Sequence, residues 1–121
     1  MTDPGRLAAL DRQGCLDLLR TVSVGRLAWV DGGGRVQVRP VNFTLGSAHD
    51  GPCVLVRCRD GEILAAALSG RPFSFEADQL EPALRGGWSV LVVTEGVQIN
   101  TATGTGLPDP WAGGERPHVL R

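Results

Sequence analysis

Two alternating segments joined by a glycine-rich turn constrain the fold of this chain more than any other feature. Residues 24–30 and 35–45 each divide into two alternating faces, with Leu27 and Trp29 on one face of the first segment and Val36 and Val38 on one face of the second, which is typical of half-buried strands. The four residues between these segments are Asp31-Gly32-Gly33-Gly34, and glycine readily adopts the positive φ angles that a tight hairpin turn requires. The sequence therefore predicts an antiparallel β-hairpin and a fold based on strands.

Further segments predict more strands and two short helices. We expect the strands at 53–58, 73–77 and 88–99, a loop at 46–52, and helices near 12–20 and 61–69. Asp11 and Asp60 are suitable N-caps for these helices, and Gly70 is a suitable stop for the second one. Pro40 has no amide donor, which marks an edge or an opening of the sheet.

These elements predict one small domain. Five strands with short helical connections favour an antiparallel barrel over a doubly wound parallel sheet. From Asn100 onward the composition shifts to glycine, proline and threonine. We therefore expect a flexible N-terminus at 1–10, a barrel domain at 11–100 and a Gly/Pro-rich tail at 101–121.

Composition excludes several classes of function. All twelve cationic residues are arginine, and the chain has no lysine and no tyrosine. A Schiff-base lysine, a P-loop lysine and a tyrosine acid are thereby excluded. The net charge of −1 argues against nucleic-acid binding, and no apolar run approaches the roughly 20 residues that cross a bilayer. Three cysteines without C-x-x-C spacing, and no N-terminal signal sequence, favour a cytoplasmic protein.

Most isolated candidates for chemistry have a simpler structural explanation. The triple glycine lacks the GK[ST] ending of a phosphate-binding loop. His49 and His118 form no paired motif, so loop histidines are favoured over metal or haem ligands. Cys53 and Cys58 are predicted to point to opposite faces of one strand, which excludes a joint metal site. Glu76 and Asp78 share a strand face, as an acid–base pair or, more commonly, as a solvated strand end.

Five strings in sequence carry a family resemblance. They read VGRLAWV, RPVNF, VRCRDGEILAAALSGRPFSFEAD, GWSVLVV and PWAGGERPHVLR. In this order they resemble the pyridoxamine 5′-phosphate oxidase-like, FMN-binding split β-barrel family, and within it the small actinobacterial flavin-binding, nitroreductase-like branch. The resemblance runs from about Leu16 to the C-terminus. It implies a mainly β, six-stranded antiparallel split barrel with short helices, whose last strand is missing here or is supplied by a neighbouring subunit.

The resemblance also implies a cofactor and a partner. Family members are typically homodimers that hold two FMN molecules in grooves between the subunits. The residues implied at the cofactor are Arg39, Pro40, Val41 and Asn42 along the flavin ring, Arg57, Cys58, Arg59, Glu62 and Ile63 around the phosphate, and Trp88 and Ser89 near the flavin or the dimer seam. The flavin would exchange hydride directly with a small-molecule substrate or a nicotinamide, so no catalytic side chain is implied.

The phosphate region departs from the family pattern, which reads R-T-x-x-G-[ST]-K. This chain has Arg57-Cys58-Arg59-Asp60-Gly61-Glu62-Ile63 at the same place. A Glu62 carboxylate about 4 Å from a phosphate would repel it by about 1 kcal/mol or more, even at high dielectric. Ile63 replaces the family's lysine, and Arg59 or Arg71 would have to supply the missing positive charge.

Two functions of different classes follow. The first is an FMN-dependent oxidoreductase with hydride transfer at a dimer interface, with a deazaflavin as a variant cofactor. The second is a degenerate split barrel that has lost tight FMN binding and acts as a binding or regulatory module, which the residues Glu62 and Ile63 favour. Flavin absorption bands that survive desalting would support the first function, and their loss would support the second.

Overall fold

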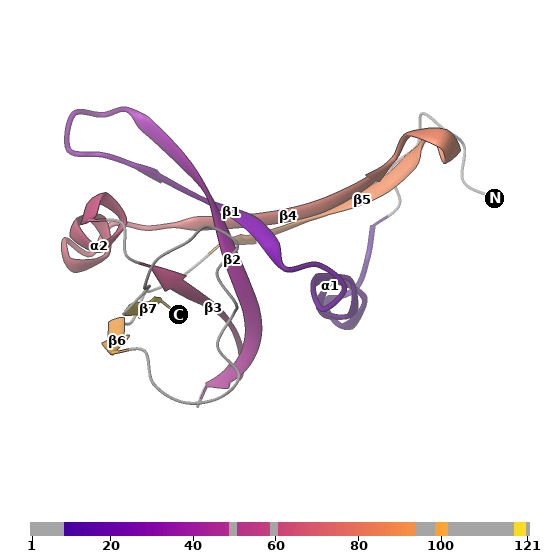
Figure 1. The fold of residues 1–121 in the computed structure, drawn as a ribbon, viewed down its shortest axis with the longest axis horizontal. Coiled ribbons are helices and arrows are strands. Elements are labelled where there is room, and N and C mark those ends of the chain that lie inside the picture. The colour runs from indigo at the N-terminus through magenta and orange to yellow at the C-terminus, as the bar shows by residue number, and fades with distance from the viewer. Residues whose placement is uncertain (1–8, 49–50, 59–60, 94–98, 102–117, 121) are drawn as a thin grey trace.

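The strands form one antiparallel sheet with two helices packed on it. The computed structural model describes residues 9–48, 51–58, 61–93, 99–101 and 118–120. The strands are β1 (Val24–Val30), β2 (Val36–Ala48), β3 (Gly51–Cys58), β4 (Ser74–Glu81), β5 (Gly86–Val93), β6 (Ile99–Thr101) and β7 (His118–Leu120), and the helices are α1 (Arg12–Leu19), α2 (Gly61–Leu68) and the 3-10 turn η1 (Pro82–Leu84). The seven strands lie in the order β5-β4-β1-β2-β3-β7-β6, and every neighbouring pair is antiparallel (Figure 1).

The predicted hairpin at residues 24–45 is confirmed, and Asp31 holds its turn. The Asp31 Oδ1 atom accepts hydrogen bonds from the backbone amides of Gly33 at 2.9 Å and Arg35 at 3.0 Å. Gly34 has a φ of 80°, the left-handed conformation that favours glycine. The turn sets the register in which Trp29 lies opposite Gln37, and this register decides which β2 side chains share a face with Trp29.

Strand β2 changes partner at its middle. Its residues 36–42 pair with β1, and its residues 43–48 pair with β3, so the strand bends from one half of the barrel to the other (Figure 1). The Phe43 amide donates to the Ser23 carbonyl at 3.0 Å, and the alternation of the ladder then places Pro40 in a non-hydrogen-bonded pair with Arg26. Pro40 therefore removes no hydrogen bond from the β1 ladder, as expected for a proline at an opening of the sheet.

Several boundaries differ from the sequence prediction. The segment predicted as a loop at 46–52 belongs largely to strands, because β2 runs to Ala48 and β3 begins at Gly51. The small and turn-prone residues of this segment led to the prediction of a loop, whereas the structure has a hairpin in which Gly46 pairs with Cys53. Strand β4 continues to Glu81, beyond the predicted end at 77, because β5 pairs with it along its whole length. Strand β5 covers Gly86–Val93 rather than 88–99.

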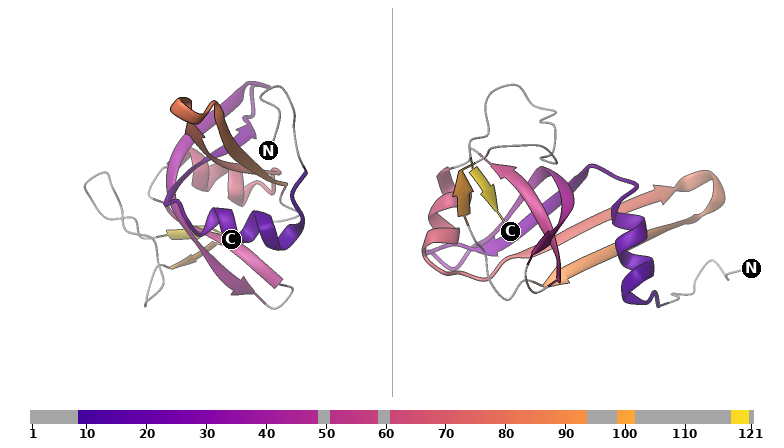
Figure 2. Two further views of the ribbon diagram at one scale, coloured as in Figure 1. Left: turned by 90° about the vertical axis from the view of Figure 1, so that its right-hand side faces the viewer. Right: turned by 90° about the horizontal axis from the view of Figure 1, so that it is seen from below.

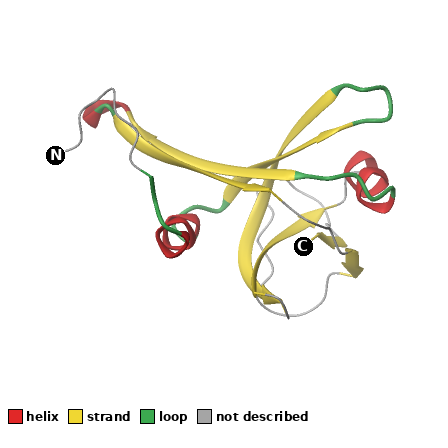
Figure 3. Cartoon of the chain, turned by 180° about the vertical axis from the view of Figure 1, so that it is seen from behind, coloured by secondary structure: helices red, strands yellow, loops and turns green. Residues whose placement is uncertain are grey.

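The extended β4–β5 hairpin projects beyond the rest of the sheet (Figure 3). β1 pairs with β4 only at residues 74–76, so the outer part of the hairpin has no third strand beside it in the described structure. The end strands β5 and β6 are not paired with each other in the described residues. The fold is thus a mainly β, open split barrel, as predicted. It gains β7 from the end of the predicted tail.

Two aromatic pairs form the centre of the core. Phe43 contacts Phe75 edge to face with ring centroids 4.7 Å apart, and Trp29 contacts Phe73 at 5.4 Å. The buried apolar residues of the described chain are Leu19, Leu27, Trp29, Phe43, Val56, Ile63, Ala66, Ala67, Phe73, Phe75, Ala77 and Val90. They come from β1–β5, both helices and the segment before β4, so this core unites the described barrel.

The helices lie at opposite ends of the barrel (Figures 1 and 2). Helix α1 begins where the Asp11 carboxylate accepts a hydrogen bond from the Gly14 amide at 2.7 Å, as its sequence predicts. Helix α2 ends before Gly70, whose φ of 76° again matches the predicted stop. The cap predicted at Asp60 lies outside the described residues. None of the helices in the described part of the chain is long and apolar enough to cross a membrane.

Candidate functional site

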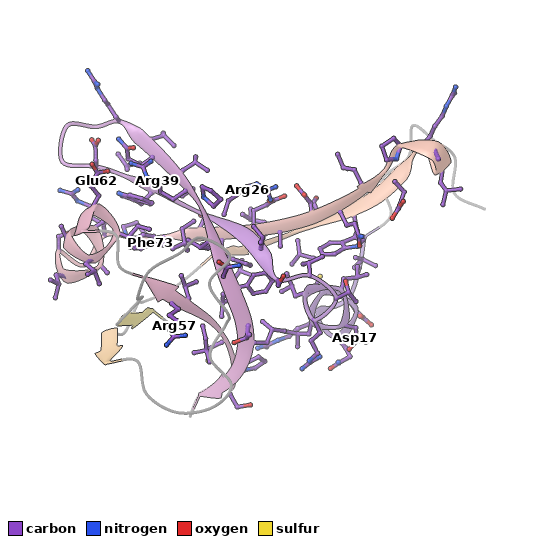
Figure 4. The ribbon with its side chains drawn as sticks, in the orientation of Figure 1. Asp17, Arg26, Arg39, Arg57, Glu62 and Phe73 are labelled. Atoms are coloured by element: carbon purple, nitrogen blue, oxygen red, sulfur yellow. The ribbon has the colours of Figure 1, made fainter. Side chains whose placement is uncertain are left out.

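The clearest juxtaposition of predicted site residues joins β2 to α2. The Arg39 Nη2 atom lies 2.7 Å from the Glu62 Oε2 atom, and the Arg39 guanidinium lies over the Trp29 ring, 5.7 Å from its centroid. Figure 4 shows Arg39 and Glu62 side by side between α2 and the β1–β2 hairpin. A guanidinium held against an aromatic ring presents its planar fork of donors in a fixed orientation.

A chain of hydrogen bonds supports Arg39 from the hairpin side. Arg39 Nη1 donates to the Gln37 side-chain oxygen and to the Val38 carbonyl, both at 3.2 Å. Gln37 Nε2 donates in turn to Asp31 Oδ2 at 2.8 Å. The Arg35 amide, followed by the Gln37 side chain, holds the pKa of Asp31 below its usual value. Asp31 therefore stays anionic and fixes Gln37, which orients Arg39.

Glu62 owes its place to the start of α2. It stands in the first turn of the helix, where the unpaired backbone amides favour a negative charge. Its side chain is 67% exposed, while that of Arg39 is 35% exposed. An ion pair this exposed to water contributes little to stability, so the carboxylate can leave Arg39 for water at modest cost.

The strand alternation divides the residues that were predicted along a flavin ring. Arg39 and Val41 face the same side of β2 as Trp29, while Pro40 and Asn42 face the other side. Pro40 is exposed on this outer side, whereas the Asn42 side-chain nitrogen is buried. A planar ligand along β2 would therefore contact side chains from one of these pairs and backbone from the other.

The remaining predicted residues are spread over three elements. Arg57 and Cys58 end β3, where they pair with β7, and Arg59 lies outside the described residues. The Ile63 side chain is 1% exposed and belongs to the core, so at this position the side chain points away from any surface site. Its predicted role at a phosphate stays a prediction.

Trp88 and Ser89 lie on β5, opposite Gln79 and Asp78. This pairing places them in the half of the β4–β5 hairpin next to its turn. The turn end of this hairpin lies away from α2 (Figure 1). The structure therefore brings Arg39 and Glu62 together, but it does not bring Trp88 and Ser89 to them. The sequence analysis missed Gln37 and Asp31, although the hairpin places Gln37 beside Arg39 and Asp31 beside Gln37.

A second charged cluster lies on the outer face of the sheet. Arg26 Nη1 lies 2.9 Å from Glu76 Oε1 and 3.6 Å from Asp78 Oδ1. Burial raises the pKa of Glu76, and the hydrogen bond and negative charge of Asp78 raise it further. The shared face predicted for Glu76 and Asp78 is thus confirmed. Arg26, on the neighbouring strand β1, forms ion pairs with both carboxylates.

Exposed apolar side chains surround this cluster on the same face. Paired residues share a face, so the register from β2 across β1 and β4 to β5 places the exposed residues Val30, Val36, Val38, Leu91 and Val93 on one surface with Arg26 and Glu76. We call these five residues the outer apolar face. No group of three or more His, Cys, Asp or Glu side chains placed to hold a metal ion occurs in the described part of the chain.

Comparisons with known proteins place the whole described barrel. Residues 11–107 match a family model described as pyridoxamine 5′-phosphate oxidase. The structure of the FAD binding protein from Mycobacterium smegmatis is 25% identical, with a TM-score of 0.64, over 92% of this chain and 85% of that one. A conserved protein of unknown function from Corynebacterium diphtheriae is 24% identical, with a TM-score of 0.65, over 92% and 86% of the two chains. A structure from Corynebacterium glutamicum is 21% identical, with a TM-score of 0.66, over 99% and 86%. No curated protein matches the sequence.

Proposed function

The chain belongs to the pyridoxamine 5′-phosphate oxidase family, and from this premise we propose that it binds FMN and acts as a flavin-dependent oxidoreductase. The fold shared with the FAD binding protein from Mycobacterium smegmatis supports a flavin as the class of ligand. The protein would be cytoplasmic, and its small-molecule substrate would be oxidised or reduced at the flavin.

The Arg39–Glu62 pair is the observation that carries this proposal. A guanidinium that already holds a carboxylate at 2.7 Å has the geometry to hold a phosphate oxygen instead. The guanidinium presents its N–H donors in a planar fork that phosphate oxygens can match, and a phosphate has more oxygens than a carboxylate. The residues present therefore fit a phosphate-bearing ligand, provided that Glu62 swings into water when the ligand enters.

The side chains around Arg39 would bind and orient the ligand rather than react with it. A bound flavin would supply the two-electron redox chemistry. Gln37 and Asp31 would keep the guanidinium directed at the phosphate, and Trp29 would exclude water from its inner side. Arg57 would add positive charge from the end of β3.

A second copy of the chain would complete the site. Trp88 and Ser89 lie apart from Arg39 within one subunit, so their contact with a shared ligand would have to come from the partner. The outer apolar face supports such a partner, since its five residues are 51–72% exposed. Exposed apolar side chains that gather on one face of a sheet in this way are typical of an interface. We therefore propose a homodimer that forms through the outer apolar face.

Retention of FMN by the purified protein tests the proposal. The protein is loaded with FMN, desalted, and examined for flavin absorption bands, and its affinity is then measured by fluorescence titration. Binding at micromolar concentration or tighter supports the proposal. Riboflavin, which lacks the phosphate, is the matched control, and equal affinity for both ligands would contradict the role of Arg39 at the phosphate.

One observation favours a second function. The Arg39–Glu62 ion pair neutralises the guanidinium without any ligand, which a barrel that has lost tight FMN binding would also do. Such a protein would keep the fold and the dimer and serve as a binding or regulatory module. A dimer that retains no FMN at micromolar concentration would establish this alternative over the oxidoreductase.

A further inference from the structure

A pocket of about 360 Å³ lies between α1, the β2–β3 hairpin and β5, at the end of the barrel away from α2. Its volume falls within the range of small-molecule sites. None of the predicted cofactor residues that the structure describes lines it. Two of its lining residues, Leu91 and Val93, also belong to the outer apolar face, but none belongs to the proposed flavin site.

The inner part of the pocket is apolar. Leu19 and Val90 form buried parts of its lining, with exposures of 2% and 5%. Leu45, Val54 and Val92 add partly buried aliphatic surface from three strands. A ligand body placed here would leave water for aliphatic side chains, which favours an apolar molecule.

A single cation stands among the apolar residues. Arg12 lines the pocket from the first turn of α1, and its Nη2 atom lies 3.5 Å from the position of a Cβ built on Gly51 at the start of β3. The guanidinium thus spans from the helix to the hairpin. Within the described residues Arg12 makes no ion pair, and the described lining contains no carboxylate. An anionic group on the ligand would supply this missing partner.

Two thiols complete the lining. Cys15 on α1 and Cys53 on β3 are both free and partly exposed. Sulfur is polarisable and makes favourable contacts with aromatic rings, and a guanidinium also stacks on them. The combination favours an aromatic ligand body over a plain alkyl chain.

We propose that this pocket binds a compact aromatic carboxylate, with the carboxylate on Arg12 and the rings between Cys15, Cys53 and the aliphatic lining. This inference does not depend on the proposed flavin chemistry. The two thiols are natural reporters of occupancy, because a bound ligand covers both of them.

The full-length protein and 2-naphthoate test the proposal. Alkylation by iodoacetamide is followed separately for Cys15 and Cys53 by peptide mass spectrometry, with and without the ligand. We expect 2-naphthoate to slow the alkylation of both thiols. Failure at millimolar ligand, or protection of only one thiol, would overturn the proposal.

Charge recognition is tested by calorimetric titration of two variants. Arg12→Gln should weaken 2-naphthoate binding by about three- to tenfold, because an exposed ion pair is lost, and should leave neutral 2-naphthamide unaffected. Arg20→Gln removes the arginine at the other end of α1, which pairs with Asp17 and lies outside the pocket lining, and should change neither affinity. Both side chains are exposed, so both variants should fold, as circular dichroism will check. Equal effects of the two substitutions would refute the assignment of Arg12.

Discussion

Glu62 Oε2 lies 2.7 Å from Arg39 Nη2, so a carboxylate in the first turn of α2 forms an ion pair with a guanidinium on β2. Any phosphate that binds Arg39 must displace this carboxylate or stand beside it. The sequence resemblance implied repulsion between Glu62 and a phosphate, and the Arg39–Glu62 ion pair adds a second effect, because a phosphate proposed at Arg39 would compete with Glu62 for the guanidinium. Both effects would weaken the proposed phosphate binding.

Replacing Glu62 with glutamine should tighten FMN binding by about three- to tenfold, because it removes both the competitor and a nearby negative charge worth about 1 kcal/mol. Riboflavin affinity should stay the same, since riboflavin has no phosphate. Fluorescence titration of both ligands measures the effect. Glu81→Gln, at the exposed far end of β4, is the control variant. An equal gain for riboflavin would place the phosphate elsewhere.

Restoring the family's lysine at position 63 should destabilise the protein instead of improving the site. The Ile63 side chain is 1% exposed in the core, so Ile63→Lys would bury an ammonium group or force the helix to move. We expect a loss of about 3 kcal/mol or more in the free energy of unfolding, against about 1 kcal/mol for Ile63→Val. Urea denaturation measures both. A lysine variant as stable as the valine variant would show that this side chain reaches the surface.

The Glu76 carboxyl should make stability depend on pH. Burial and Asp78 raise its pKa in the folded state, so the folded state binds this proton more tightly than the unfolded state does. Its stabilising contribution is complete below the unfolded-state pKa and is lost as the pH rises through the folded-state pKa. Glu76→Gln should therefore gain stability relative to the natural protein as the pH rises from about 4.5 to 7.

Urea unfolding at several pH values measures the difference between the Glu76→Gln variant and the natural protein. Glu81→Gln lies on the same strand, outside the Arg26 cluster, and is the control for loss of one carboxylate. A difference that stays constant with pH would contradict the raised pKa of Glu76.

Self-association should depend on the outer apolar face. Val38 is 52% exposed near the start of β2, so Val38→Asp should leave the subunit fold intact and place a charge in the proposed interface. Sedimentation equilibrium should then report a monomer where the natural protein is a dimer. Leu68→Asp, on α2 and 78% exposed, adds the same charge outside this face and should not change the mass. A Val38→Asp dimer would exclude this surface.

The sequence predicted the barrel well where side-chain alternation and turn chemistry agree. The hairpin around Asp31, the Asp11 cap and the Gly70 stop each depend on neighbouring residues, so local rules were sufficient. The extension of β4 to Glu81 could not be predicted in this way, because Gln79 and Glu81 are polar and exposed. Their strand conformation comes from pairing with β5, a partner that the local sequence does not reveal.

In the candidate site, too, local sequence predicted some features, while others depend on tertiary packing. A resemblance in sequence could align Ile63 with a family lysine, but it could not show that α2 turns this side chain into the core. Conversely, the hairpin register places Gln37 opposite Trp29 and Arg39 two residues further along the same face. The contact between Arg39 and Trp29 was therefore implicit in the turn. Its pairing with Glu62 required the placement of α2, which is a tertiary feature.

Gly25 shows how closely the core is packed beneath the proposed interface. A Cβ at this position of β1 would clash with the Phe75 ring at Cζ and would lie 2.7 Å from the Glu76 carbonyl oxygen. The Phe75 ring cannot retreat easily, since it packs edge to face on Phe43 at 4.7 Å. Gly25→Ala should therefore lower the free energy of unfolding by about 1–3 kcal/mol through overpacking. Gly86→Ala, in β5, meets only a carbonyl oxygen at 3.8 Å and should change stability by no more than about 0.5 kcal/mol. Equal stability of the two variants in urea would mean that the β1–β4 contact is looser than the structure shows.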